Sequence, residues 1–309
     1  MTDGVPARPA AEVPPAALLD LLRELGDLKR VRSAAHDGSI SERLFAHAWG
    51  WLVAGGGVAD VWRSVAADAL AATRLGDLDE AAFTAVGIPA EAARDIRRRA
   101  LEEACEGLPA ALVDAVVIGL DVEAVREAPP PFVARLARQP RAGVTCPGRP
   151  RLLLEPPENH AEHCLMTAVY GVILSPTYGA DPGTVFLASL AHHLHNVWLP
   201  DSGFAGEVLM GEHLEPAFAR ATEMSLAELP DALAAATRTA RRILPDDATP
   251  EGRAFHAADT LDRVLQIEQH LRAGKATMRY VLHDMALVHE GPVKTFQDRL
   301  LRAVGLLEP

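Results

Sequence analysis

Three histidines within four positions follow a strongly apolar stretch of the chain, Val185–Ala191; they are His192, His193 and His195. Core packing gives no reason for so many polar rings at the end of an apolar helix. Imidazole nitrogens bind Zn, Mn, Co and Fe, so the cluster could supply ligands to a divalent transition metal. Adjacent helical residues point about 100° apart. His192 and His193 can still both reach an ion that lies off the side of the helix.

Two other segments offer the remaining ligands for such a site. His163 lies one turn into a predicted helix that opens at Glu158, and Asp259 lies on a later helix after two small residues. Three helices can converge on one cation when each carries a His or Asp at a position that interrupts its apolar pattern. The residue types alone fit buried hydrogen-bonding side chains equally well.

The elements that must position these residues are expected to be helices. Aromatic residues make up only 5% of the chain, and Ala and Leu are abundant, which favours helix over sheet. We predict helices at about 158–175, 182–196, 212–225, 227–243, 249–273, 275–290 and 293–306. In the first half, helices are predicted at Leu18–Leu25, on both sides of Gly55–Gly57, after Pro89, and twice between Pro109 and Arg138. The fold class is therefore all-α, and only Arg151–Leu154 could form a short strand.

A break in composition suggests where domains meet. The stretch 139–157 is rich in Pro and Gly, as linkers and crossing loops are. We expect a mobile tail over residues 1–14, a helical region of unknown role over 15–140, and a metal-binding domain over 141–309.

Charge and hydropathy restrict the partners. The net charge of −12 argues against nucleic acid or an anionic membrane surface. The expected partner is a small-molecule substrate, which could be anionic because a metal can dominate its own pocket; a homodimer is left open. A start without an apolar leader, and cysteines without a disulfide pattern, predict a cytoplasmic protein.

The three segments resemble the HD-domain superfamily of metal-dependent phosphohydrolases, over about residues 148–290. They are most similar to bacterial 5′-deoxynucleotidases, which carry Glu-Asn-x-x-Glu-His, a later Leu-x-His-Asp, and then Ala-Asp-x-Leu. The corresponding segments here are Glu158–His163, Leu190–His193 and Ala258–Leu261. The resemblance implies an HD-like helical metal domain in which His163, His192 and Asp259 hold the metal.

Two positions depart from the family pattern. The Asp of the His-Asp pair is His193 here, and the catalytic Glu three residues later is Asn196. With His193 as a ligand, the site would have three His and one Asp, which favours one Zn, Mn, Co or Fe ion over Mg or a dinuclear centre. Asn196 cannot act as a base, so we place it among the substrate-binding residues.

The remaining roles come from the resemblance and from position. Asp201 falls where the family has a catalytic acidic residue, and His195 or Glu207 could also replace the missing base. Arg149 and Arg151 lie near the family's substrate-phosphate arginine. These residues predict a metal-dependent hydrolase that acts on a small, phosphorylated substrate through a mononuclear metal-activated water.

Two other functions stay open. One is an iron-dependent oxygenase on the HD fold, for which His213 would be an additional ligand. The other is a non-catalytic binding or scaffold protein, which the loss of the Glu at Asn196 favours.

Two further patterns are weak. The spacing of His195 and Glu207 partly matches a zinc pattern of a ubiquinone-biosynthesis family. An intact His283-Asp284 pair lacks a following Ala-Asp-x-Leu, and we expect a helix-end or surface role for it.

Overall fold

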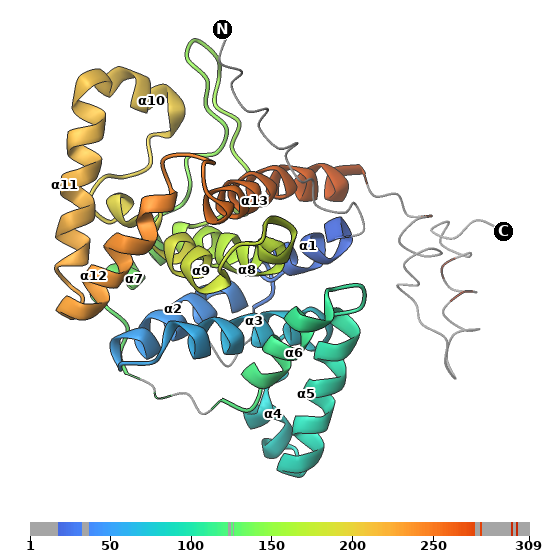
Figure 1. Ribbon diagram of the computed structural model, residues 1–309. Helices are drawn as coiled ribbons and strands as arrows, with labels where there is room; N and C mark the ends of the chain where they lie inside the picture. Colours follow the sequence, from blue (N-terminus) through green and yellow to red (C-terminus); the bar gives the residue numbers. More distant parts are fainter. Residues whose placement is uncertain are drawn as a thin grey trace, which may run out of the picture. The chain divides into compact units, whose positions relative to one another are not determined.

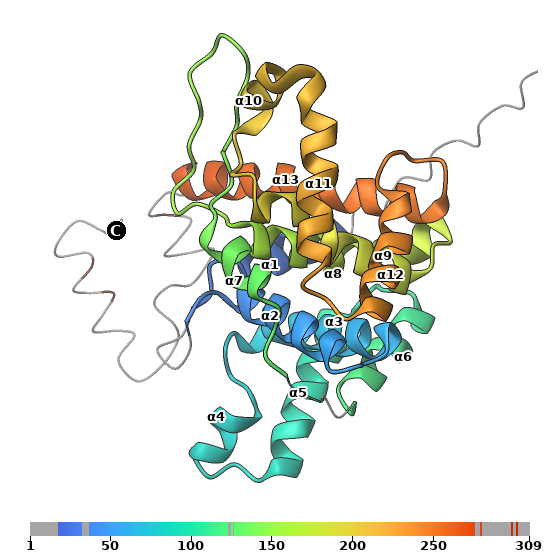
Figure 2. The same cartoon turned by 90° about the vertical axis from the view of Figure 1, so that its left-hand side faces the viewer.

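The structure is a computed structural model that describes residues 18–32, 37–122, 125, 127–275 and the single positions 279, 298 and 301. Among these residues every regular element is a helix, which confirms the all-α fold (Figures 1 and 2). None of the helices in this part of the chain is long and apolar enough to cross a membrane.

The first half of the chain folds into the helices that its capping residues, glycines and prolines predict. Ser39 and Glu42 form a reciprocal capping box at the start of α2, and glycines at 55–57 separate α2 from α3. Pro89 and Pro109 stand at the N-caps of α5 and α6. The helices are α1 (Leu18–Asp27), α2 (Ile40–Val53), α3 (Val58–Leu75), α4 (Glu80–Ala85), α5 (Ala90–Ala104), α6 (Ala110–Gly119) and α7 (Pro131–Arg138). The short α4 was not predicted.

The second half carries the histidine segments. Its α-helices are α8 (His160–Tyr178), α9 (Pro182–Ala191), α10 (Gly203–Met210), α11 (Leu214–Leu226), α12 (Asp231–Ala240) and α13 (Pro250–Lys275). Three short 3-10 helices join them: η1 (Leu194–Val197), η2 (Gly211–His213) and η3 (Arg241–Ile243).

Three expectations for this half need correction. The predicted helix 182–196 ends at Ala191, because the backbone turns at His192 and His193 and continues as η1. The predicted helix 227–243 starts only at Asp231, after Pro230 at its N-cap. Arg151–Leu154 forms no strand; Leu152 makes only an isolated antiparallel bridge with Val144. The α10 helix was not predicted, and most of the expected helices 275–290 and 293–306 lies outside the described residues.

The chain divides into two compact units, Met1–Val264 and Leu265–Pro309. In the first unit α8 is the central helix, and every residue from His160 to Ser175 is buried. It contacts α9 most extensively, and also α1, α2, α3 and α7 (Figure 1). Helices from both sides of residue 140 therefore share one core. In the second unit, Gln266 Nε2 lies 3.2 Å from His270 Nε2 on α13.

The crossing of α8 and α9 depends on a glycine, and its substitution should destabilise the fold. A Cβ added at Gly171 would lie 2.5 Å from Val185 Cγ1. We expect Gly171→Ala to lower the free energy of unfolding by about 1–3 kcal/mol, as overpacking does. Urea denaturation measures this. Gly274→Ala is the control, because its Cβ would meet no atom within 4 Å; unchanged stability of Gly171→Ala would contradict the close approach.

Candidate metal centre

Helix capping fixes where His163 stands. The Asn159 side chain accepts a hydrogen bond from Glu162 N (2.9 Å), and the Glu162 carboxylate accepts one from Asn159 N (3.0 Å). This capping box starts α8 at His160 and places His163 one turn in. Two residues of the Glu-Asn-x-x-Glu-His motif therefore have a structural role, which is to hold the histidine in position.

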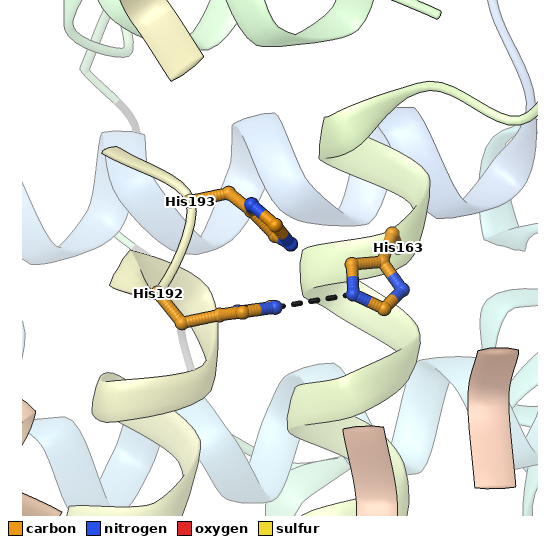
Figure 3. Close-up of side chains that lie close together, drawn as sticks. All are labelled: His163, His192 and His193. Carbon is orange, nitrogen blue, oxygen red and sulfur yellow. Dashed lines mark hydrogen bonds between the residues drawn. The ribbon is translucent and has the colours of Figure 1, made fainter. Parts of the chain in front are cut away.

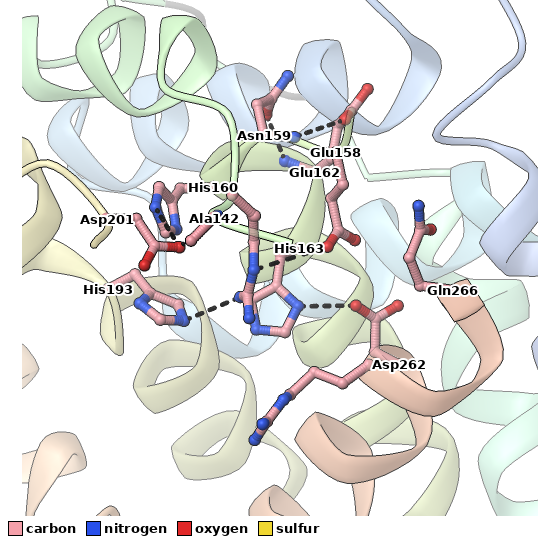
Figure 4. A network of polar contacts seen from close by, with 12 residues as sticks. Ala142, Glu158, Asn159, His160, Glu162, His163, His193, Asp201, Asp262 and Gln266 are labelled. Atoms are coloured by element: carbon pink, nitrogen blue, oxygen red, sulfur yellow. Dashed lines mark hydrogen bonds and ion pairs between the residues drawn. The ribbon is translucent and has the colours of Figure 1, made fainter. Parts of the chain in front are cut away.

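His163 is completely buried, and its tautomer follows from its neighbour. Its Nδ1 atom lies 2.7 Å from Asp262 Oδ2 (Figure 4). An ionised carboxylate only accepts hydrogen bonds, so Nδ1 carries the proton and Nε2 presents a lone pair. The charge of Lys29 and the hydrogen bond from His163 hold the pKa of Asp262 below its ordinary value, although burial alone would raise it.

His192 offers the same nitrogen from α9. Its Nδ1 donates to the Ser189 carbonyl oxygen at 2.6 Å, so its Nε2 also carries a lone pair. That Nε2 lies 3.1 Å from His163 Nε2, and the two rings point toward each other in Figure 3. Two acceptor nitrogens at this distance repel each other unless a cation lies between them. Burial is the main cause that holds the pKa of His192 well below its usual range, and it favours the neutral ring.

His193 turns toward the same point because the helix ends before it. Its Nδ1 lies 2.7 Å from Asn196 Oδ1, and Asn196 Nδ2 donates to Leu199 O (3.1 Å). The second bond orients the amide, so Asn196 accepts and His193 Nδ1 donates. Ligand nitrogens of His193, His192 and His163 all lie within 4.8 Å of one another. Burial also keeps the pKa of His193 well below its usual range.

Asp259 adds an anionic oxygen to the three imidazoles. Its Oδ1 lies 3.1 Å from His163 Nε2 and 3.9 Å from His192 Nε2. Donors about 2.1 Å from a tetrahedral ion lie about 3.4 Å apart, so this set fits Zn²⁺ or a similar ion.

A second group of ligand-type atoms has a different explanation. Glu158, His163 and Asp262 also lie close enough together to hold an ion. However, the Lys29 ammonium lies 2.5 Å from both Glu158 Oε1 and Asp262 Oδ1. A protein cation therefore already balances these carboxylates. The first group, in which the Nε2 atoms of His163 and His192 face each other, is therefore the candidate metal site.

The first of the predicted bases, Asp201, is held by backbone hydrogen bonds close to a histidine beside the cluster. Asp201 accepts hydrogen bonds from Ala142 N (2.9 Å) and Gly203 N (2.8 Å), and its Oδ2 lies 3.7 Å from Nε2 of the completely buried His160. The ring centroid of His160 lies 4.8 Å from that of His193. Asp201 is thus held rigidly on the His193 side of the centre.

The other two candidate bases differ in accessibility. His195 stacks on Phe218 with ring centroids 4.0 Å apart, and burial lowers its pKa to about 4. Glu207 on α10 is half-buried, and burial followed by the charge of Asp201 raises its pKa. The positive charges of Arg263, which contacts Asp259, and Arg141, which contacts His193, lower the pKa of Glu207 and partly oppose this rise.

The arginine beside the cluster is one that the sequence did not indicate. Arg141 Nη1 lies 3.1 Å from His193 Nε2, and Arg141 Nε lies 3.7 Å from Glu158 Oε2. Arg149 and Arg151 are exposed, and Arg151 reaches only the Ser202 carbonyl, at 3.3 Å. Asn196, expected to bind substrate, is buried with its amide engaged by His193 and Leu199.

Other sequence signals fall away from the centre. His213, the additional ligand that an oxygenase would need, is exposed just before α11, so no contact of this residue supports the oxygenase. The His283-Asp284 pair lies outside the described residues. Lys29 and Asp262 were given no role in advance, although Asp262 stands one helical turn after Asp259 and so on the same face.

Comparison with known proteins agrees with this geometry. A family model with the description "HD domain" matches residues 133–298. No curated protein and no solved structure matches the chain.

Proposed function

The chain belongs to the HD-domain family, and on that basis we propose that it is a metal-dependent hydrolase of small phosphorylated molecules. One observation carries the proposal: three imidazoles, each with its Nδ1 atom bonded to an acceptor, direct Nε2 lone pairs toward one point beside a carboxylate. Histidine ligands in metal sites have this type of partner on the second nitrogen. Histidines buried only for hydrogen bonding would not place two acceptor nitrogens, His163 Nε2 and His192 Nε2, 3.1 Å apart.

The donor set suggests the ion. His163, His192 and His193 contribute nitrogens and Asp259 contributes an oxygen, which suits Zn, Mn, Co or Fe better than Mg. Such an ion lowers the pKa of a coordinated water toward 7 and so supplies a nucleophile at neutral pH. Hydrolysis therefore does not depend on a glutamate at position 196.

Glu207 is our candidate for the group that takes a proton from the attacking water. The pKa of Glu207 is raised and so lies closer to neutral pH than that of an ordinary glutamate. A general base works best when its pKa is near the operating pH. Both Asp201 oxygens already accept backbone hydrogen bonds, so Asp201 is better suited to orient His160 and the loop around Ala142. His195, with its ring against Phe218, is less accessible.

Arg141 is our candidate for binding the substrate's phosphate. Its guanidinium lies against the lone pair of His193 Nε2. When that nitrogen binds a cation, Arg141 loses an acceptor and is repelled by the ion, which leaves it available to an anion beside the centre. The resemblance to 5′-deoxynucleotidases makes nucleoside 5′-monophosphates the first substrates to test.

Metal analysis of the purified full-length chain, followed by phosphate release from a panel of phosphomonoesters, tests the proposal. We expect close to one Zn, Mn, Co or Fe per chain and hydrolysis that chelation abolishes and added metal restores. Iron with oxygen consumption would favour an oxygenase instead. Absence of any bound metal would favour the scaffold.

Glu207→Gln should reduce kcat/KM by about 10²–10⁴-fold, as loss of a general base does. The glutamate must be ionised to accept a proton. Because its folded pKa is raised, activity should fall with decreasing pH at a value above 4.5, and this limb should disappear in the variant. Glu212→Gln, an exposed neighbour, is the control. A limb that persists in Glu207→Gln while metal content stays constant would assign the base elsewhere.

A further inference from the structure

Lys29 is a fully buried lysine in a part of the chain that the HD-domain match does not cover. Its side chain is 1% exposed, and it follows α1 rather than any helix that carries a predicted ligand. Lysine is almost never buried without a charged partner. Here the ammonium has two partners, Glu158 and Asp262, each at 2.5 Å. The two carboxylates keep the pKa of Lys29 above its ordinary value, although burial alone would lower it.

The two carboxylates lead from Lys29 to two different metal ligands. Asp262 binds Lys29 through Oδ1 and His163 Nδ1 through Oδ2. Glu158 binds Lys29 through Oε1, while its Oε2 lies 3.7 Å from Arg141 Nε. The Arg141 guanidinium in turn lies against His193. Two cations and two anions balance in this network, in which only Arg141 is half-buried rather than buried; part of it is drawn in Figure 4.

The helix that precedes Lys29 is fixed to the helix that carries His163. Tyr170 of α8, which is completely buried, donates a hydrogen bond from its hydroxyl to the Leu22 carbonyl in α1. Leu25 and Leu28 beside it are buried in the same core. The distance from Lys29 to the centre is therefore set by packing between α1 and α8.

We infer that Lys29 is a positioning residue of the metal centre, which orients His163 through Asp262 and thereby makes the segment after α1 part of the site. The inference rests on the proposed metal binding. With its Oδ1 atom held by the ammonium, Asp262 keeps one orientation, and its Oδ2 atom accepts a hydrogen bond from His163 Nδ1. Nε2 is then the only nitrogen of His163 that can bind the ion.

A merely structural ion pair would have different consequences. Removal of such a pair would lower stability, but folded protein would bind metal with unchanged affinity. If Lys29 orients His163, the affinity and the ligand field of the ion must change, and the change must pass through Asp262.

The test uses the full-length chain, with Zn²⁺ affinity measured by chelator competition and the absorption spectrum of bound Co²⁺ as a second readout. Lys29→Met should weaken Zn²⁺ binding by about 10–100-fold and shift the Co²⁺ bands, as loss of a partner behind a ligand does. Asp262→Asn should also weaken binding, and Lys29→Met should add little in that background because both act on one pathway.

Arg74→Met is the matched control. Arg74 ties Glu24 of α1 to Glu103 of α5 by ion pairs of 2.6 and 2.9 Å without touching the network. It should leave Zn²⁺ affinity and the Co²⁺ spectrum unchanged.

Three results decide the inference. Wild-type affinity and spectrum in folded Lys29→Met would overturn it, as would independent effects of Lys29→Met and Asp262→Asn. If Lys29→Met does not fold, Asp262→Asn alone decides, because wild-type affinity in that variant breaks the pathway. A wild-type chain that binds no metal would instead refute the proposed function.

Discussion

His163→Ala is expected to abolish both metal binding and hydrolysis while the chain stays folded. His163 Nε2 lies 3.1 Å from the ligand atoms of both His192 and Asp259, so its loss leaves the donors without their common neighbour. Loss of the metal removes the nucleophile at neutral pH. An effect of several kcal/mol is expected from metal catalysis, so kcat/KM should fall by at least about 10³-fold.

Metal content per chain and initial rates of phosphate release measure this effect together. His213→Ala is the matched control, because this histidine is exposed outside the cluster and should change neither quantity. The substitution at 163 also leaves Asp262 without its imidazole partner, so circular dichroism must show an intact fold. Normal metal content in folded His163→Ala would remove this residue from the ligand set and contradict the proposed centre.

Local patterns predicted the helices well because helix formation depends mainly on near neighbours. The glycines at 55–57 and the prolines at 89 and 109 ended or started helices where the sequence placed them. Pattern analysis failed at His192 and His193, where an apolar periodicity continues although the α-helix does not. The break matters for the site, because it allows two adjacent rings to point the same way.

Some residues of the site stand in recognisable local sequence motifs, whereas others are identified only by contacts with distant parts of the chain. His163, His192, His193 and Asp259 are brought together as the motifs suggested, since each stands at a marked position of its own helix. Lys29 gave no local signal, because its partners lie far along the chain and only the contact between α1 and α8 brings them near.

Arg141 was missed for a related reason. It lies in a Pro- and Gly-rich stretch where composition predicts only a loop. Its position follows from pairing with a distant segment, since Arg141 N donates to Glu158 O at 2.7 Å. Loop residues are placed by such tertiary contacts, and sequence periodicity does not report them.

His193 and Asn196, the two positions at which the sequence resemblance implies a departure, are in direct contact, and this contact leads to a second large expected effect. Asn196 Oδ1 accepts the proton of His193 Nδ1, which a carboxylate at position 193 could not donate. His193→Asp alone would therefore place two acceptors opposite each other. If the amide flipped, its oxygen would instead face the Leu199 carbonyl. We expect His193→Asp to weaken Zn²⁺ binding by about 10–100-fold and to favour Mn²⁺ over Zn²⁺, because an oxygen replaces a nitrogen.

The double variant His193→Asp/Asn196→Glu introduces the two residues that the sequence resemblance implies at these positions, and it should recover Mn²⁺-dependent hydrolysis that neither single variant shows. Side chains in direct contact give non-additive effects, so the double variant should exceed the sum of the singles. Asn196→Asp is the control, since it keeps an acceptor opposite His193 Nδ1 and loses only the donor to Leu199 O, so it measures the Leu199 contact separately. Chelator competition with both ions, and rates with each, measure the coupling. Additive effects would mean that the two residues changed independently; a positive coupling would mean that the imidazole at 193 requires the amide at 196 to hold its tautomer.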